Sequence, residues 1–116
     1  IDAMKPKPAS WLNRLSFSNN SDEPISKVVI QWRTHTVEIP SDRIQRHSSY
    51  VKKVPIREPI EPTFKITVHF PEGDPVVHEQ TIALHPEEKK VIEIVYLGEK
   101  EIRVTEKKKN PHIGGR

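Results

Sequence analysis

Apolar and polar residues alternate with a period of two along most of the chain, and proline, glycine or asparagine interrupts this alternation at short intervals. Successive side chains of a strand point to opposite faces of a sheet, so this pattern is typical of strands that bury one face. It is clearest at 63–70, where every second residue from Phe64 to Phe70 is apolar. Strands are predicted at 12–18, 25–33, 34–39, 50–54, 63–70, 76–84, 91–97 and 102–105.

Two of these segments, 25–33 and 91–97, carry apolar residues on both faces, which predicts that they lie in the middle of a sheet. Trp32 is in the inward phase of the first of them and is predicted to anchor the core. The segment 34–39 is either a separate strand or the far half of a long bent one. The number of strands is therefore seven or eight.

Short strands joined by turns determine the expected architecture. Eleven prolines among 116 residues disfavour long helices. Seven or eight strands at this spacing are typical of two sheets packed face to face. We therefore expect an all-β, immunoglobulin-like (Greek-key) antiparallel β-sandwich. True immunoglobulin domains place a disulfide beside a core tryptophan, and in this cysteine-free chain only Trp32 remains of that pattern.

The chain has the size of one domain with two tails. Residues 1–10 are predicted to be a flexible segment that begins with a vector remnant, 11–106 to be the β-sandwich domain, and 107–116 to be a disordered basic tail. The cellular compartment stays open. The protein is cytoplasmic if Met4 is the native start, and periplasmic or extracellular if a leader was removed.

The charge balance weakly favours a nucleic-acid partner. The 19 Lys and Arg residues against 16 Asp and Glu give a formal net charge of +3. Six of the basic residues, however, lie in the two end segments. Between them, 11–57 holds eight basic and four acidic residues, whereas 58–105 holds five and ten. Because the two halves of a sandwich interleave in space, this asymmetry does not by itself predict a charged face.

The sequence contains no recognisable catalytic or cofactor motif. Cysteine is absent, and no Gly-x-Ser-x-Gly turn marks a serine nucleophile. The four glycines, at 73, 98, 114 and 115, cannot form a phosphate-binding loop. Apolar stretches are far shorter than the about 20 residues that a membrane-spanning helix needs. We therefore predict a protein that is not an enzyme, binds no cofactor and does not span a membrane.

Histidine is the usual metal ligand when cysteine is missing, and His69 and His78 flank a predicted hairpin. If the hairpin pairs Phe70 with Val77, the two imidazoles stand opposite each other on one face, with Cβ atoms about 5 Å apart. If it pairs Phe70 with Val76, they point to opposite faces. Since no third ligand follows from the spacing, we predict no metal site.

The most concentrated basic segment surrounds Tyr50 and supplies the predicted binding residues. These are Arg43, Arg46, Tyr50, Lys52, Lys53 and Arg57. Such a segment can bind an acidic protein surface, grip phosphates or protect an edge strand from aggregation. Three aromatic rings are expected to be exposed, because the others are in core phase. They are Trp11, Tyr50 and Tyr96.

We predict a non-catalytic protein–protein interaction domain whose partner is another protein with an acidic surface. An inhibitor, an immunity-type protein and an accessory subunit of a larger assembly all have this form, by analogy at the level of fold. The alternative is a nucleic-acid-binding module that uses the basic 43–57 stretch and the lysine-rich tail.

Overall fold

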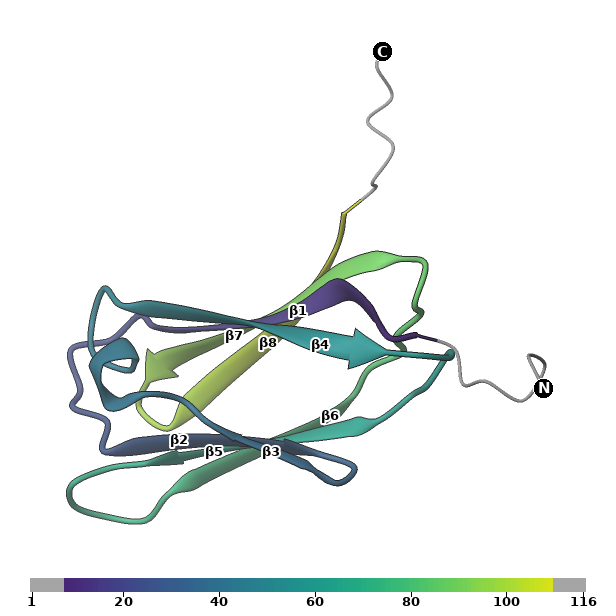
Figure 1. Cartoon of the computed structure of the whole chain (residues 1–116). Coiled ribbons are helices and arrows are strands. Elements are labelled where there is room, and N and C mark those ends of the chain that lie inside the picture. The colour runs from purple at the N-terminus through teal and green to yellow at the C-terminus, as the bar shows by residue number, and fades with distance from the viewer. Residues whose placement is uncertain (1–7, 110–116) are drawn as a thin grey trace, which may run out of the picture.

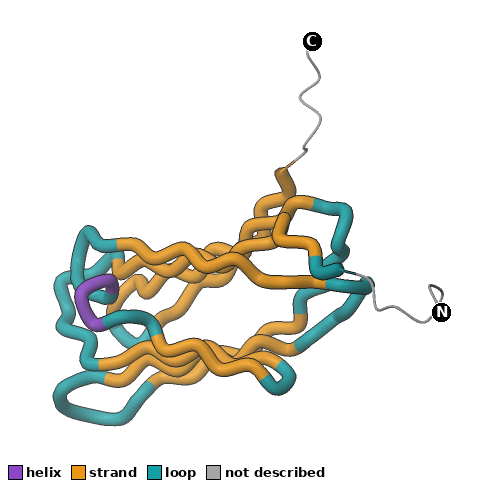
Figure 2. The backbone as a smooth tube through the Cα atoms, in the orientation of Figure 1, coloured by secondary structure: helices purple, strands orange, loops and turns teal. Residues whose placement is uncertain are grey.

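The computed structural model describes residues 8–109 and arranges them in eight strands that form two layers (Figure 1). Turns gather at the two ends of the layers (Figure 2). The prediction of an all-β fold with seven or eight strands is confirmed. Within this part of the chain, no helix has the length and apolar character that crossing a membrane requires. The elements are β1 Ser10–Asn19, β2 Lys27–Trp32, β3 His35–Glu38, the 3₁₀ turn η2 Ser41–Arg43, β4 Ser49–Ile56, β5 Thr63–His69, β6 Val76–Thr81, β7 Lys89–Gly98 and β8 Glu101–Lys109.

Each sheet contains four strands, in the order β4-β1-β7-β8 in the first sheet and β3-β2-β5-β6 in the second. All neighbouring strands are antiparallel except β1 and β7, which run parallel from the pair Arg14 and Val91 to the pair Asn19 and Tyr96. The expectation of a wholly antiparallel sandwich is therefore wrong for this pair. Parallel neighbours cannot be joined by a tight turn, and here the chain from β2 to β6, which includes all four strands of the second sheet and β4 of the first, connects them.

The core lies between the two sheets and is built from the inward-facing residues of each strand. Phe64, Ile66 and Val68 of β5 are fully buried, as their alternation predicts. Trp32 is 4% exposed, and its ring lies 5.3 Å from that of Phe64, which confirms its predicted role in the core. The strands predicted to be central, β2 and β7, each have a neighbour on both sides.

The last strand is longer than the sequence predicts. β8 pairs with β7 as far as Lys109, so residues 107–109, assigned above to a disordered tail, belong to the sheet. Ion pairs accompany this pairing: Lys107 Nζ lies 3.4 Å from Glu93 Oε2, and Lys108 Nζ lies 3.6 Å from Glu88 Oε1. The other residues of the two predicted tails lie outside the described residues, apart from those at 8–10, of which Ser10 begins β1.

One buried polar side chain fixes the loop after β1 and the segment after η2 to the end of the first sheet. Asn19 is 2% exposed, and its Nδ2 donates to the carbonyl oxygens of Ile44, at 3.1 Å, and Glu23, at 3.3 Å. Its Oδ1 accepts from the Ser21 amide at 3.0 Å and from the Ser21 hydroxyl at 2.7 Å. Asn19 thereby uses both of its donors and accepts twice, and it holds the connection between β3 and β4 beside β1.

Candidate functional site

The predicted binding residues lie on or near β4, the strand at one edge of the first sheet. Lys52 and Lys53 are exposed, and as successive residues of a strand they project from opposite faces. Tyr50 is half-buried and packs against the core. Arg43 lies in η2, and Arg57 follows the last residue of β4 and is exposed.

Two of the predicted arginines are each bound to another group of the protein. Arg46 forms an ion pair with Asp22, which lies in the connection between β1 and β2. Arg43 donates from Nη1 to the carbonyl oxygen of Ser49 at 3.3 Å. The structure therefore divides the basic segment, and Lys52 and Lys53 are the two basic residues that β4 itself carries.

A groove runs between the edge strands of the two sheets, with β3 on one side and β4 on the other. We call it the β3–β4 groove; it has a volume of about 240 Å³. The His35 ring stacks on that of Trp32 at 5.2 Å, which gives the groove an aromatic wall. Trp11, at the start of β1, also lines it and is 55% exposed. The lining residues are Trp11, Trp32, His35, Thr36, Val37, Lys52, Lys53 and Pro55.

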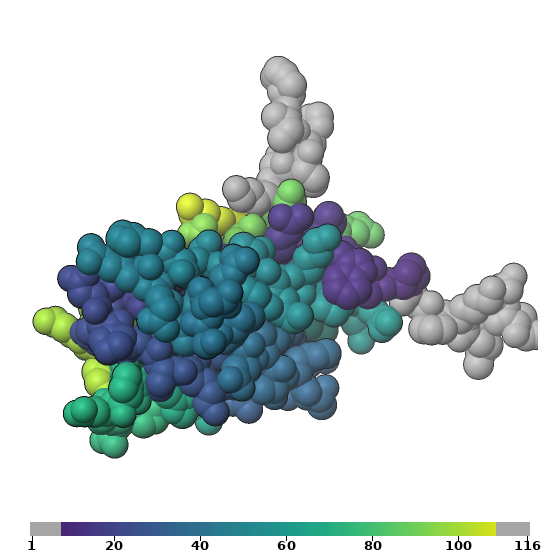
Figure 3. All heavy atoms as spheres, turned by 60° about the vertical axis from the view of Figure 1, so that its left-hand side comes forward, coloured from purple at the N-terminus to yellow at the C-terminus, as the bar shows by residue number. Residues whose placement is uncertain are grey.

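A second hollow, of about 520 Å³, lies at the other end of β4. Its lining includes Arg43 from η2 together with Tyr50 and Val51 from β4, and the Val51 side chain is 56% exposed. Figure 3 shows teal residues of the η2 and β4 region on the face turned forward, with the start of β1 in purple beside them. The edge formed by β4 is thus hollowed at both ends.

The three rings expected to be exposed have different environments. Trp11 is exposed and lines the β3–β4 groove, whereas Tyr50 is half-buried. The expectation for Tyr96 is wrong, because its side chain is fully buried and its ring lies 5.4 Å from that of Phe70. The tyrosine hydroxyl tolerates this burial because the Glu23 carboxylate accepts a hydrogen bond from it at 2.6 Å.

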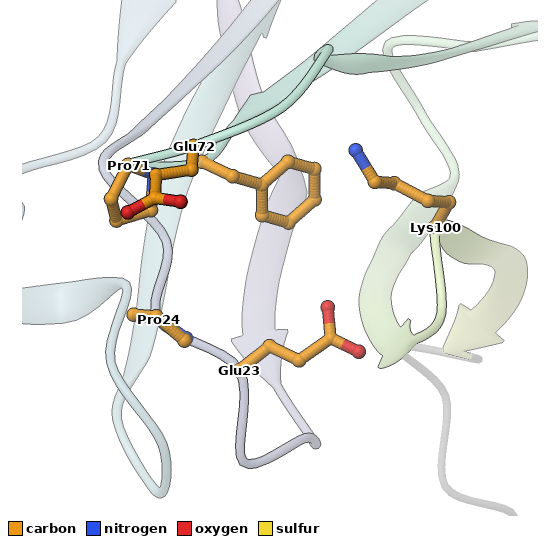
Figure 4. A pocket seen from close by; sticks show the side chains of 6 residues that line it. Glu23, Pro24, Pro71, Glu72 and Lys100 are labelled. Carbon is orange, nitrogen blue, oxygen red and sulfur yellow. The ribbon is translucent and has the colours of Figure 1, made fainter.

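Glu23 and Tyr96 belong to a cluster that joins the turns after β1, β5 and β7 at one end of the sandwich. Figure 4 shows Glu23, Pro24, Pro71, Glu72 and Lys100 of these turns. The Glu23 carboxylate also accepts a hydrogen bond from the Glu99 amide at 2.7 Å, and the Tyr96 hydroxyl accepts one from the Lys100 amide at 3.0 Å. The Lys100 ammonium lies 4.3 Å from the centre of the Phe70 ring. A hollow of about 270 Å³ opens between these turns. Because the hydrogen bonds occupy both carboxylate oxygens, the cluster is suited to holding the turns together.

The hydrogen bonds of this cluster change the acidity of both partners. The Tyr96 hydroxyl, the Glu99 amide and the nearby Lys100 charge lower the pKa of Glu23 from its usual 4.5, against the opposing effect of burial. Burial, followed by the hydrogen bond to Glu23, raises the pKa of Tyr96 from 10.0 to about 12. Near neutral pH the pair therefore holds its proton on the tyrosine, so Glu23 is not suited to act as a general acid.

Removing the Tyr96 hydroxyl is expected to lower the free energy of unfolding by about 2 kcal/mol near pH 7, the range for a hydrogen bond to a charged group. The lowered pKa of Glu23 stabilises the fold above pH 4.5, and this contribution is lost as the pH falls through the folded pKa. The raised pKa of Tyr96 stabilises the fold below pH 10.0, and this contribution is lost as the pH rises towards about 12.

Urea unfolding of the wild type and of Tyr96→Phe, from about pH 3 to about pH 11, measures these effects. The difference in stability between the two proteins should be largest near neutrality and should narrow at both extremes. Tyr50→Phe is the matched control, since it removes a hydroxyl from a tyrosine outside the cluster. A difference that stays constant across the pH range would contradict the assigned linkage.

The register between β5 and β6 decides how the two histidines lie. His78 pairs with the buried Ile66 and is on the inward side, where its Nε2 lies 3.0 Å from Gln80 Oε1. His69 pairs with Lys27 on the outward side of the same sheet. The two imidazoles therefore project from opposite faces and cannot hold one ion together. Among the described residues, no group of three or more histidines and carboxylates is placed to hold a metal ion.

The exposed β4 edge thus combines an aromatic groove, two lysines and a second hollow on one side of the sandwich. This arrangement can bury an apolar side chain of another molecule while the lysines meet its acidic groups. No protein-family model, no curated protein and no solved structure matches the chain.

Proposed function

We propose that this chain is a non-catalytic, immunoglobulin-like protein-binding domain whose binding surface is the β4 edge. This edge comprises Tyr50 to Pro55 with the hollow at each end. The observation that supports the proposal is the exposed Trp11 beside Lys52 and Lys53 at a groove with an aromatic wall. Tryptophan is one of the residue types that are enriched among those that dominate binding energy in protein interfaces. An inhibitor, an immunity-type protein or an accessory subunit would use such an edge.

Charge supports an acidic partner. The residues that line the β3–β4 groove include two lysines and no carboxylate. The second hollow contains Asp42 beside Arg43, so the positive character is strongest at the Trp11 end. A carboxylate-bearing segment laid along β4 would place its charges near Lys52 and Lys53 while an apolar side chain enters the groove.

Nucleic-acid binding has weaker support. Base stacking along a strand of nucleic acid uses several exposed rings, and the burial of Tyr96 leaves Trp11 with the half-buried Tyr50. Lys107 and Lys108, from the predicted basic tail, form ion pairs with Glu93 and Glu88. The basic residues are therefore partly neutralised where a phosphate backbone would need them.

Selection from a random peptide library, with the whole protein immobilised, tests the proposal. The enriched peptides should be acidic and should carry an apolar or aromatic residue. The double substitution Lys52→Glu/Lys53→Glu should weaken their binding by at least about tenfold, a change of about 1.4 kcal/mol. Lys27→Glu/Lys65→Glu is the matched control, because it makes the same charge change on the exposed outward face of the second sheet.

Two results would contradict this function. Enriched peptides that bind both double variants equally well would show that the β4 edge is not the binding surface. Tight binding of single-stranded oligothymidylate that weakens steeply between about 50 and about 200 mM salt and is lost in Lys52→Glu/Lys53→Glu would favour the nucleic-acid alternative.

A further inference from the structure

The backbone groups on the free side of β4 can be identified from the way β1 is paired. The Asn20 amide donates to the Tyr96 carbonyl of β7 at 2.8 Å. Along a strand, the N–H and C=O groups of alternate residues point to the same side. The even-numbered residues of β1 therefore face β7, and its odd-numbered residues face β4. Leu15 faces Lys52 across this ladder, and Phe17 faces Tyr50.

It follows that the even-numbered residues of β4 point their backbone groups towards β1 and the odd-numbered residues point theirs away. Two independent contacts agree with this assignment. The Arg43 guanidinium reaches the Ser49 carbonyl from outside the sheet. Pro55, which has no N–H, occupies an odd-numbered position, and proline is accepted in an edge strand where its nitrogen faces away from the neighbour.

Of the odd-numbered residues of β4, Val51 and Lys53 then present both an N–H and a C=O to the free side, whereas the carbonyl of Ser49 accepts from Arg43 and Pro55 has no N–H. Within residues 8–109, neither Val51 nor Lys53 forms a backbone hydrogen bond outside the β1–β4 ladder. Ser49 and Pro55 therefore mark the two ends of this stretch. The open edge is therefore short, with room for about four hydrogen bonds to an added strand.

We propose that an acidic, extended segment of a partner protein binds as an additional strand against β4, through the backbone groups of Val51 and Lys53. This inference rests on the proposed function and specifies its mode of recognition, in which backbone pairing supplies affinity and side-chain pockets supply specificity. Side chains of the added strand alternate between two faces. The side chains on one face of the added strand lie next to the β3–β4 groove. Lys52 and Lys53 project from opposite faces of β4, so they attract carboxylates on both faces of the added strand.

The same residues disfavour a second copy of this chain as the occupant. Antiparallel pairing of two β4 edges would bring the Lys52–Lys53 pairs of both copies together, and like charges at such positions are destabilising. The proline at position 55 limits how far pairing can extend. The edge therefore resists self-association while it remains open to a short acidic strand.

Amide hydrogen exchange in the free protein tests the assignment of the backbone groups. The amides of Val51 and Lys53 should exchange at least about tenfold faster than those of Lys52 and Val54, which donate to β1. Exchange that is equally slow at all four positions would overturn the inference before any ligand is added.

Strand addition is tested with a fluorescein-labelled, capped heptapeptide in which glutamate and valine alternate. Val51→Pro removes an outward N–H and should weaken its binding by at least about tenfold, whereas Val51→Ala keeps the N–H and should change binding less than about threefold. Two peptides with N-methyl groups, on the glutamate amides in one and on the valine amides in the other, should differ in affinity, because only one set of amides faces β4.

The outcomes separate this inference from the proposed function. If Lys52→Glu/Lys53→Glu abolishes binding of the heptapeptide while Val51→Pro and both N-methylated peptides behave like their parents, strand addition is overturned and the protein-binding function stands. If the heptapeptide does not bind although acidic peptides from the library do, strand addition is likewise overturned. If neither the lysines nor Val51 affect any peptide, both proposals fail.

Discussion

Replacing Trp32 with alanine is expected to lower the free energy of unfolding by about 4 kcal/mol, the range observed when a large aromatic residue is removed from a core. Trp32 is 4% exposed and contacts Phe64 on the core side and His35 on the groove side. Its removal would create a cavity and leave the imidazole of His35 without a stacking partner. For a domain whose total stability is about 5 to 15 kcal/mol, this is a large fraction.

Trp11→Ala is the matched control, since it makes the same substitution at another tryptophan that lines the β3–β4 groove, whose side chain is 55% exposed. It should change the free energy of unfolding by less than about 1 kcal/mol. It should also lower the affinity of any ligand that binds in the β3–β4 groove. Urea denaturation followed by far-ultraviolet circular dichroism measures both effects. Equal losses of stability in the two variants would show that Trp32 does not carry the core as described.

The second large effect is expected for Asn19→Ala, which should lower the free energy of unfolding by about 3 kcal/mol. The substitution removes four hydrogen bonds and leaves the buried Ile44 carbonyl without its partner. It should also loosen the connection that carries Arg43, because Asn19 joins this connection to β1. The loss should therefore appear both in urea denaturation and as faster amide exchange between η2 and β4.

Asn13→Ala provides the comparison, because Asn13 is also an asparagine of β1 and is fully buried. Its Nδ2 donates to the His85 carbonyl at 3.0 Å, whereas its Oδ1 accepts no hydrogen bond from the described residues. The buried Oδ1 without a partner destabilises the folded state, so replacing Asn13 also removes this unfavourable contribution and offsets part of the stability lost with the Nδ2 hydrogen bond. Asn13→Ala should therefore cost about half as much stability as Asn19→Ala, and the reverse order would contradict the assigned roles.

Much of the fold could be predicted because burial follows the alternation of the strands directly. Phe64, Ile66 and Val68 are apolar at every second position and are all fully buried. The central positions of β2 and β7 were also predictable, since both faces of these strands are apolar. These properties depend on residues close together in the sequence.

The errors concern contacts between distant segments. Nothing near β1 or β7 indicates that they pair in parallel, because that depends on the path of all the chain between them. Tyr96 was expected to be exposed. Its hydroxyl can be buried because it donates a hydrogen bond to Glu23, a residue that is distant in the sequence. In the sequence, residues 107–109 are typical of a basic tail. In the structure, Lys107 and Lys108 form ion pairs with Glu93 and Glu88 of distant segments.

The candidate site was predictable only in part, for the same reason. The concentration of basic residues around Tyr50 was visible in the sequence, but the ion pair of Arg46 with Asp22 and the hydrogen bond of Arg43 to Ser49 were not. Trp11 was expected to be exposed, yet its place beside Lys52 and Lys53 depends on how β1 pairs with β4. The sequence signal for the groove is the tryptophan at the start of β1, which lies just outside the alternating segment 12–18.

The parallel pairing of β1 with β7 has a consequence for synthesis on the ribosome. Before β7 has been synthesised, β1 can pair with β4 but has no neighbour on its other side, where β7 belongs. Leu15 and Phe17 then remain attached to an incomplete layer until β7 has left the exit tunnel. The first sheet can therefore be completed only late in synthesis, because the pairing of β1 depends on a strand that is made much later.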